Sequence, residues 1–191
     1  IAPRLPDFFR LNPDITLSID AGFWPDDPVR EELDVSLQYD TTNVGDFVVQ
    51  PVATLHYAPF ATRPYLELYG APKSLADLLR HRVIAHSAVR FQPDTWNPKI
   101  SAVRTLADSA LDTNCSATII MAAQSGAAVA QLPTCAVRFM PDLVMLGEAP
   151  IASPKLYLVY RADVGRIVRV RRVIDWIKTM FDPQENPWFR S

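Results

Sequence analysis

The side chains that could do chemistry are few and scattered along this chain. The two cysteines are Cys115 and Cys135, and no CxxC pair or Cys/His ligand spacing accompanies them. A structural zinc site is therefore not expected. His81 and His86 flank the sequence RVIA, and we interpret them as ordinary histidines beside a strand rather than as a metal pair. The sequence predicts neither a bound metal nor a cofactor.

Signatures of enzymes are also missing from the sequence. It contains no GxGxxG, P-loop or GxSxG motif, and AQSGA at 123–127 falls inside a predicted helix. Cys115 stands at the start of that helix, a position that can lower the pKa of a thiol. No histidine lies near it in the sequence, and no resolving cysteine is evident. We assign no catalytic residue and expect no enzyme, although an α/β enzyme with Cys115 as nucleophile stays an alternative.

Two predicted helices begin with small polar residues. Thr62 precedes one helix, and Asn114 or Ser116 opens the other. The first turn of a helix carries unpaired N–H groups and partial positive charge, which suit a carboxylate or phosphate. Such helix starts converge at the carboxyl edge of α/β sheets, where ligands bind. The plain alternative is that these residues only cap their helices.

The helix that starts at Asn114 or Ser116 also opens an uncharged run that extends to Val137. We predict a buried helix to about Gly126, followed by the buried strand AAVAQL, which Pro133 ends. A membrane span needs about twenty mainly apolar residues. The polar residues inside this run therefore argue against a span.

The remaining chain alternates between strand-like and helix-like patterns. Strict alternation predicts strands at 14–20 and 33–40, and apolar or β-rich runs predict further strands at 46–60, 82–86, 100–110, 142–146 and 156–160. Pro51 marks an edge or a bend within the third of these. Helical spacing covers the first eleven residues, and Asn12-Pro13 ends that helix. Strands interspersed with helices predict an α/β fold.

Composition argues against DNA binding by these residues. The chain has 191 residues, a net charge of −2 and a pI of about 5.9, whereas duplex-DNA binders usually carry a basic footprint. Five arginines gather in RADVGRIVRVRR at 161–172. An apolar stripe accompanies them, so they are predicted to be the solvated face of a helix. The stripe consists of Ile167, Val170, Ile174, Ile177 and Phe181.

The order of the motifs resembles the regulatory, effector-binding domain of LysR-type transcriptional regulators. The resemblance covers almost all of 1–181, and each motif alone is loose, but five occur in the family's order. The most specific is HYAPFATRPYLELYGAPKSLADLLRHRVI, which is similar to a family segment with the pattern "YL…G.P…DL..H". The other four are APRLPDFFRLNPDITLSI, LDVSLQYD, TNCSATIIMAAQSGAAVAQLP and LYLVYRADVGRIVRVRRVIDWI.

The resemblance implies a type 2 periplasmic-binding-protein-like fold, with two Rossmann-like subdomains and an effector cleft between them. Subdomain I would comprise 1–60 and 141–182, and subdomain II would comprise 61–140. The tail 183–191 lies beyond the family pattern, and its apolar Trp188 and Phe189 are predicted to pack on this domain or on a neighbour. The resemblance also implies a winged helix-turn-helix domain upstream of this sequence. The family's first strand of the regulatory domain is expected to be missing or truncated here.

Site residues carried over from the family fall in four places. The turn after the second strand offers Phe23 and Trp24, and the end of LDVSLQYD offers Tyr39. Thr62 would face the helix start at Asn114 and Ser116 across the bound effector. Gln-Leu-Pro, with Pro133, would mark the second hinge. Trp24 and Tyr39 are as well explained as surface or packing aromatics.

The resemblance implies a sensor of a small, anionic or aromatic-acid-like effector that controls DNA binding by the upstream domain. The chain would form a homodimer or homotetramer and would have no membrane partner. The free thiols and the absence of a signal peptide at the start of the sequence favour a cytoplasmic protein. A solute-binding protein of the same fold, used in transport, is the main alternative. Codons for a helix-turn-helix upstream would exclude that alternative.

Overall fold

The computed structural model describes residues 1–22, 33–39, 45–74, 76–87, 109–186 and 189. The chain divides into two compact units, which are described separately below. Unit 1 comprises Ile1–Thr54 and Lys155–Ser191, and unit 2 comprises Leu55–Pro154. The chain therefore passes between the units twice, at 54–55 and at 154–155, whereas the sequence predicts these boundaries at 60–61 and 140–141. The difference arises because all of β3 and β7 pair within the sheet of unit 2.

The described residues of unit 1 include a three-stranded antiparallel sheet. Its order is β1 (Ser36–Tyr39), β8 (Lys155–Arg161) and β2 (Phe47–Thr54). The central strand β8 is the predicted apolar strand, and Leu158 and Val159 on its two faces are both buried. Strand β2 is an edge strand of this sheet, which agrees with the edge or bend predicted at Pro51. Its pairing with β8 shifts register between Pro51 and Ala53.

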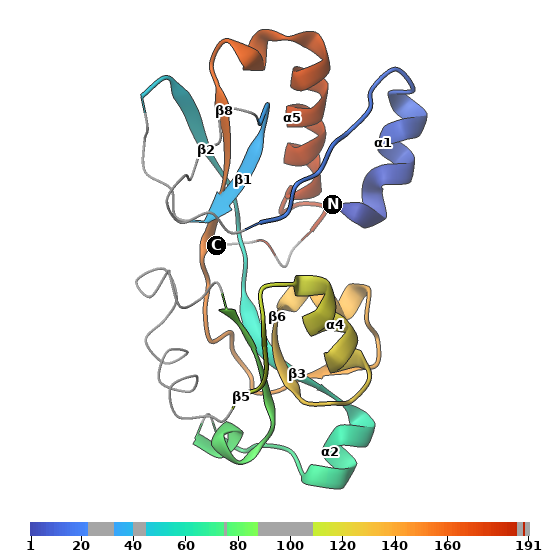
Figure 1. The fold of residues 1–191 in the computed structure, drawn as a ribbon, viewed down its shortest axis with the longest axis vertical. Coiled ribbons are helices and arrows are strands. Elements are labelled where there is room, and N and C mark those ends of the chain that lie inside the picture. Colours follow the sequence, from blue (N-terminus) through green and yellow to red (C-terminus); the bar gives the residue numbers. More distant parts are fainter. Residues whose placement is uncertain (23–32, 40–44, 75, 88–108, 187–188, 190–191) are drawn as a thin grey trace. The chain divides into compact units, whose positions relative to one another are not determined.

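Helix α5 (Val168–Met180) covers one face of this sheet, after the 3-10 turn η5 (Val164–Arg166) (Figure 1). Val170, Ile174 and Ile177 pack against Leu158 and Tyr160, as the predicted apolar stripe requires. The stripe is wrong at its first position, because Ile167 precedes the helix and is exposed. The arginines of this segment, other than the half-buried Arg161, are exposed, as predicted.

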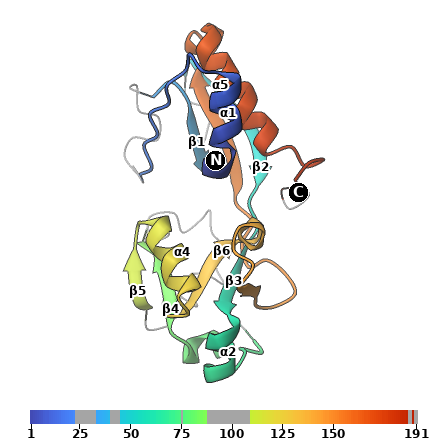
Figure 2. The same ribbon diagram turned by 90° about the vertical axis from the view of Figure 1, so that its right-hand side faces the viewer.

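Helix α1 (Leu5–Leu11) follows the turn η1 (Ala2–Arg4) and lies beside α5 (Figures 1 and 2). The Phe8 ring is buried 4.5 Å from the Trp176 ring, measured between ring centroids. Asn12 ends the helix and donates from its side-chain amide to the Phe8 carbonyl oxygen at 3.0 Å. The predicted first helix is therefore confirmed.

The strand predicted at 14–20 is wrong. These residues form no strand and pair with none of the described strands. Ile15 is buried, but Ile19 on the same predicted face is 58% exposed. Alternation specifies which face is apolar, yet a strand forms only where a neighbouring strand accepts and donates its backbone hydrogen bonds.

The tail after α5 packs on unit 1. Asn186 is buried and its side-chain amide donates to the Met180 carbonyl oxygen at 3.0 Å. The Phe189 ring lies 5.1 Å from the Phe181 ring, centroid to centroid. Packing of the tail is thus confirmed for Phe189, while Trp188 lies outside the described residues.

Unit 2 is built on a five-stranded mixed sheet with the order β5-β4-β6-β3-β7. The strands are β3 (Tyr57–Thr62), β4 (Val83–His86), β5 (Ser109–Thr113), β6 (Val129–Pro133) and β7 (Leu143–Met145). Strand β4 is parallel to β5 and β6, while β3 is antiparallel to β6 and β7. The directions of these strands decide which loops of the unit come together.

Helices cover both faces of this sheet. On one face, Ile119 and Ala123 of α4 (Ser116–Gln124) pack against Phe60, Ile84 and Ala130. Small residues in α4 allow this close approach. The other face carries α2 (Arg63–Tyr69) and the 3-10 helix η2 (Ala76–Arg80), whose buried residues pack against Ala61, Val129 and Leu146. The short helix η4 (Thr134–Arg138) follows β6.

Candidate functional site

Three strands of unit 2 end at one edge of its sheet. Because β4, β5 and β6 are parallel, His86, Thr113 and Pro133 stand at the same edge. Strand β3 runs the other way, so it begins there, at Tyr57 paired with Pro133. We call this the carboxyl edge of unit 2. In α/β proteins, ligands bind at such edges, where loops and helix starts gather.

Hydrogen bonds hold the segments at the carboxyl edge together. The N–H of Thr134 donates to the His56 carbonyl oxygen at 2.7 Å. The His56 ring nitrogen Nδ1 lies 2.8 Å from the Ser153 hydroxyl oxygen. The Cys115 N–H donates to the Thr113 hydroxyl oxygen at 3.1 Å. The first two contacts join the segments around His56, Thr134 and Ser153, which are distant in sequence, and the third is local to the turn before α4.

The start of α4 differs from the sequence prediction. Its N-cap is Cys115, which makes no side-chain cap hydrogen bond of the usual kind, and Ser116 is the first helical residue. The prediction that Asn114 or Ser116 caps the helix is therefore wrong. A residue caps a helix only if its backbone is extended while its side chain bends back to the first turn, and here Cys115 holds the extended backbone position. Asn114 and Ser116 are exposed at the carboxyl edge.

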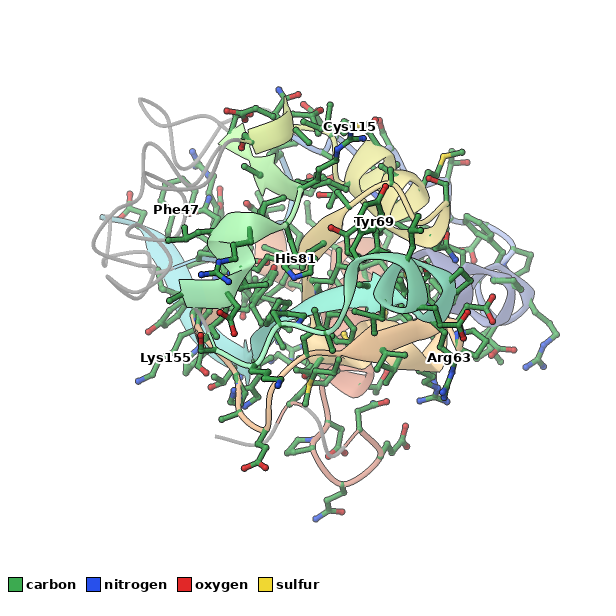
Figure 3. All side chains as sticks on the ribbon, turned by 90° about the horizontal axis from the view of Figure 1, so that it is seen from below. Phe47, Arg63, Tyr69, His81, Cys115 and Lys155 are labelled. Atoms are coloured by element: carbon green, nitrogen blue, oxygen red, sulfur yellow. The ribbon has the colours of Figure 1, made fainter. Side chains whose placement is uncertain are left out.

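Cys115 has a perturbed thiol. The Thr118 hydroxyl, followed by the N–H groups of Thr118 and Ala117, lowers the pKa of Cys115, because these donors favour the thiolate. Cys115 is exposed at the beginning of α4, where Figure 3 labels it. Cys135 follows β6 and differs, since burial raises the pKa of its thiol.

Thr62 caps α2 as predicted, because its hydroxyl oxygen accepts from the Tyr65 N–H at 3.4 Å. Its location, however, contradicts the predicted pairing with Asn114 and Ser116. Thr62 ends β3, which is antiparallel to β6, so it lies at the edge opposite the carboxyl edge. A Cβ at Gly126, beyond the far end of α4, would stand 3.0 Å from the Thr62 hydroxyl oxygen. Thr62 is also only 4% exposed.

Three other predicted site residues fall within the sequence range of unit 1. Tyr39 is the last residue of β1, is half-buried, and pairs with Leu156, next to the return passage of the chain. Phe23 and Trp24 lie outside the described residues. The structure thus brings Asn114, Ser116 and Pro133 to one edge of unit 2 and gives Tyr39 a place in unit 1.

Pro133 does not mark the second hinge. It ends β6 within unit 2, and the chain returns to unit 1 only after Pro154. The misplacement arises because β6 is followed by η4 and β7, which still belong to unit 2. Pro133 nevertheless lies at the carboxyl edge, half-buried and opposite Tyr57.

Sequence reasoning missed His56, Ser153 and Thr134 at this edge. The signal for Thr134 was its position directly after a predicted strand. His56 and Ser153 gave no such signal, because they meet only through the pairing of the two segments that enter and leave unit 2. That pairing includes the Leu55 N–H donating to the Pro154 carbonyl oxygen at 3.0 Å.

Unit 1 has a polar surface of its own. An open hollow of about 350 Å³ is lined by Asp46, Arg161, Ala162, Asp163 and Arg166. Arg161 and Asp163 already pair across 3.1 Å, which leaves little uncompensated charge. Among the described residues, no three His, Cys, Asp or Glu side chains gather as metal ligands, and no helix has the length and apolar character of a membrane span.

Solved structures similar to this chain include regulatory domains of LysR-type transcriptional regulators. The CrgA regulatory domain of Neisseria meningitidis is 17% identical, with a TM-score of 0.75 over 94% of this chain and 91% of that one. The effector domain of AmpR from Pseudomonas aeruginosa is 18% identical, with a TM-score of 0.69 over 99% and 91%. The chain covers 63% of full-length AphB, a Vibrio cholerae virulence activator, with 95% of its own length aligned at 16% identity and a TM-score of 0.70.

No curated protein sequence matches the chain. The model of the LysR substrate binding domain family, in contrast, matches residues 1–182. The predicted periplasmic-binding-protein-like α/β fold is confirmed by this match and by the structural similarity. The chain belongs to the LysR substrate binding domain family.

Proposed function

We propose that this chain is the effector-sensing domain of a LysR-type transcriptional regulator and that it binds a small acidic molecule at the carboxyl edge of unit 2. The observation that carries the proposal is the gathering of three strand ends and the exposed start of α4 at this edge. Effector binding would shift the population of states of the whole regulator and so change its contact with DNA. On the basis of the family resemblance, we further propose that DNA binding belongs to a part of the regulator outside these 191 residues.

The acidic character of the effector follows from the start of α4. The first N–H groups of a helix carry partial positive charge and accept anions. No acidic residue stands in the first turn of α4, and its N-cap is a cysteine rather than a hydroxyl or amide side chain. A carboxylate of the effector would accept hydrogen bonds from the first N–H groups of α4. Asn114 and Ser116 supply further polar contacts, and Pro133 supplies an apolar wall.

The proposal predicts that Ser116 contributes to binding more than to stability. Because Ser116 is exposed and does not cap α4, Ser116→Ala should leave the melting temperature nearly unchanged. Affinity for a carboxylate effector should fall about tenfold, which corresponds to about 1.4 kcal/mol for one lost hydrogen bond to a charged group. Ser116→Leu should block the site. Calorimetric titration with a panel of aliphatic and aromatic carboxylates measures both effects.

Ser125 provides the matched control. It is an exposed serine beyond the other end of α4, where its hydroxyl donates to the Ala122 carbonyl oxygen at 2.8 Å. Ser125→Leu should keep the affinity of the parent. If a carboxylate bound the Ser116→Leu variant as tightly as the parent, the assignment of the site to the carboxyl edge would be wrong.

Tyr39 is a separate part of the proposal, because it belongs to unit 1. Its half-buried ring ends β1 beside Leu156, and we assign it to effector contact on the basis of the family resemblance. Tyr39→Ala should weaken binding, whereas Tyr39→Phe should not if the ring makes the contact. Tyr157, a half-buried tyrosine on β8, serves as the comparison.

A further inference from the structure

One buried polar group in unit 2 lacks a protein partner. The side-chain nitrogen Nε2 of Gln131, in the middle of β6, is buried, and none of the described residues forms a hydrogen bond with it. Most buried polar atoms in folded proteins are paired. An amide donor without a partner lowers stability, so its presence calls for an explanation.

The register of the sheet explains why neighbouring strands leave this amide without a partner. Gln131 stands directly opposite Pro59 of β3. On the other side, β4 pairs Ile84 with Ala130, which places Ala85 beside Gln131 in the parallel register. Proline and alanine side chains have no hydrogen-bonding group. The row across the sheet is therefore small and apolar on both sides of a single amide.

Gln131 also lies on the face of β6 that α4 does not cover. Ala130 and Leu132 point toward α4 and belong to the core beneath it. Side chains alternate along a strand, so Gln131 shares the opposite face with Pro133. Pro133 ends β6 at the carboxyl edge, two residues further along the chain. The amide thus stands next to a residue that the proposed effector site uses.

We propose that the Gln131 side-chain amide donates a hydrogen bond to a carboxylate oxygen of the effector and thereby helps to determine specificity. This inference rests on the proposed function. It adds a residue of the opposite sheet face to the site and gives a physical reason for a glutamine in a strand whose other side chains are apolar. The hydrogen bond would form only when the effector is bound, so in the free chain the unpaired donor lowers the stability.

Gln131→Met tests the proposal, because methionine keeps the length of the side chain and removes the amide. The variant and the parent 191-residue chain are compared by thermal unfolding and by titration with acetate, benzoate and succinate. We expect a higher melting temperature, since an unpaired buried donor is removed, and at least a tenfold weaker affinity for the carboxylate that the parent binds best. The control is Gln50→Met, at a half-buried glutamine in β2 of unit 1, which should leave that affinity unchanged.

A lower or unchanged melting temperature would overturn the inference, because the amide would then have a partner, such as a bound water, in the free chain. A higher melting temperature with unchanged affinity would overturn it as well, since the unpaired amide would then serve no ligand. If Ser116→Leu abolishes binding while Gln131→Met does not, the proposed function stands and this inference fails. If the parent binds none of the three carboxylates, the acidic effector class of the proposed function fails, and the inference fails with it.

Discussion

Cys115 and Cys135 occupy opposite chemical environments within the same unit. The Thr118 hydroxyl and nearby N–H groups lower the pKa of the exposed Cys115 thiol, whereas burial raises the pKa of the Cys135 thiol. The thiolate is the reactive form. At a pH near neutrality, Cys115 is therefore the thiol that is open to reagents.

We predict that iodoacetamide modifies Cys115 with a pH midpoint below that of an ordinary cysteine, about 8.5. A lowered pKa means that the thiolate is already present at lower pH, so the rate profile moves to lower pH. Thr118→Val should move the midpoint upward, because it removes the hydroxyl that stabilises the thiolate. Mass spectrometry of the labelled peptides follows both cysteines at once, with Cys135 as the internal control. Equal midpoints for Cys115 and Cys135 would contradict the assignment.

At the scale of elements, Thr62 and Gly126 meet where α2 begins and α4 gives way to β6. Gly126 has a φ of +74°, a left-handed conformation that other residues adopt with strain. A methyl group at this position would lie 3.0 Å from the Thr62 hydroxyl oxygen. The glycine therefore both permits the turn and leaves room for the cap of α2.

Gly126→Ala should lower the free energy of unfolding by about 1–2 kcal/mol through backbone strain, with an added penalty from the Thr62 contact. The same change in a Thr62→Ala background should cost less, because the hydroxyl is gone. Thr62→Ala alone should cost about 1 kcal/mol for the lost cap. Urea denaturation of the four proteins gives this double-mutant cycle. An identical cost in both backgrounds would show that the methyl group introduced by Gly126→Ala does not touch Thr62.

At the scale of the whole molecule, the arginine-rich segment is a solvated surface. Three of its five arginines pair with carboxylates: Arg161 with Asp163 at 3.1 Å, Arg171 with Asp175 at 3.2 Å, and Arg172 with Asp14 at 3.3 Å. The net charge of the 191-residue chain is −2. We therefore predict that the chain does not bind duplex DNA at about 150 mM salt. Fluorescence anisotropy that revealed salt-sensitive, micromolar binding would refute this.

Self-association is the second prediction for the whole molecule. In unit 1, Leu11 is 69% exposed and Ile19 is 58% exposed, on the segments 5–11 and 15–19 that the family resemblance places in the contact between subunits. The resemblance predicts that these segments of one subunit contact part of 116–126 of the other, in unit 2, where Met121 is also exposed. Burying such side chains stabilises an oligomer by about 25 cal/mol per Å² of apolar surface before the costs of association.

Sedimentation of the parent at high micromolar concentration should show a dimer or tetramer. Leu11→Asp and Ile19→Asp should each weaken association at least tenfold, because a charge would have to be buried in the contact. Leu68→Asp is the matched control, since Leu68 is similarly exposed but lies on α2, outside the predicted contact. A parent chain that stays monomeric throughout would count against the prediction.

Features that depend on neighbours in sequence were predictable from the sequence. Four features follow from periodicity or from the chemistry of one side chain: the apolar stripe of α5, the apolar strand β8, the place of Pro51 in an edge strand, and the Thr62 cap. The order of the five sequence segments that resemble the family also identified that family, and the family match over 1–182 confirms it. Such features depend on residues that are close together in sequence, so they can be predicted without knowledge of the fold.

Tertiary structure alone decided the features that depend on strand direction and pairing. Thr62 and Ser116 both belong to helix starts, but β3 runs opposite to β5, so the two residues stand at opposite edges of the sheet. The segment 14–20 alternates like a strand yet has no partner among the described strands. His56 and Ser153 come within 2.8 Å although 97 positions separate them. Hydrogen bonds between strands set these outcomes, and no local pattern encodes which strands will pair or in which direction.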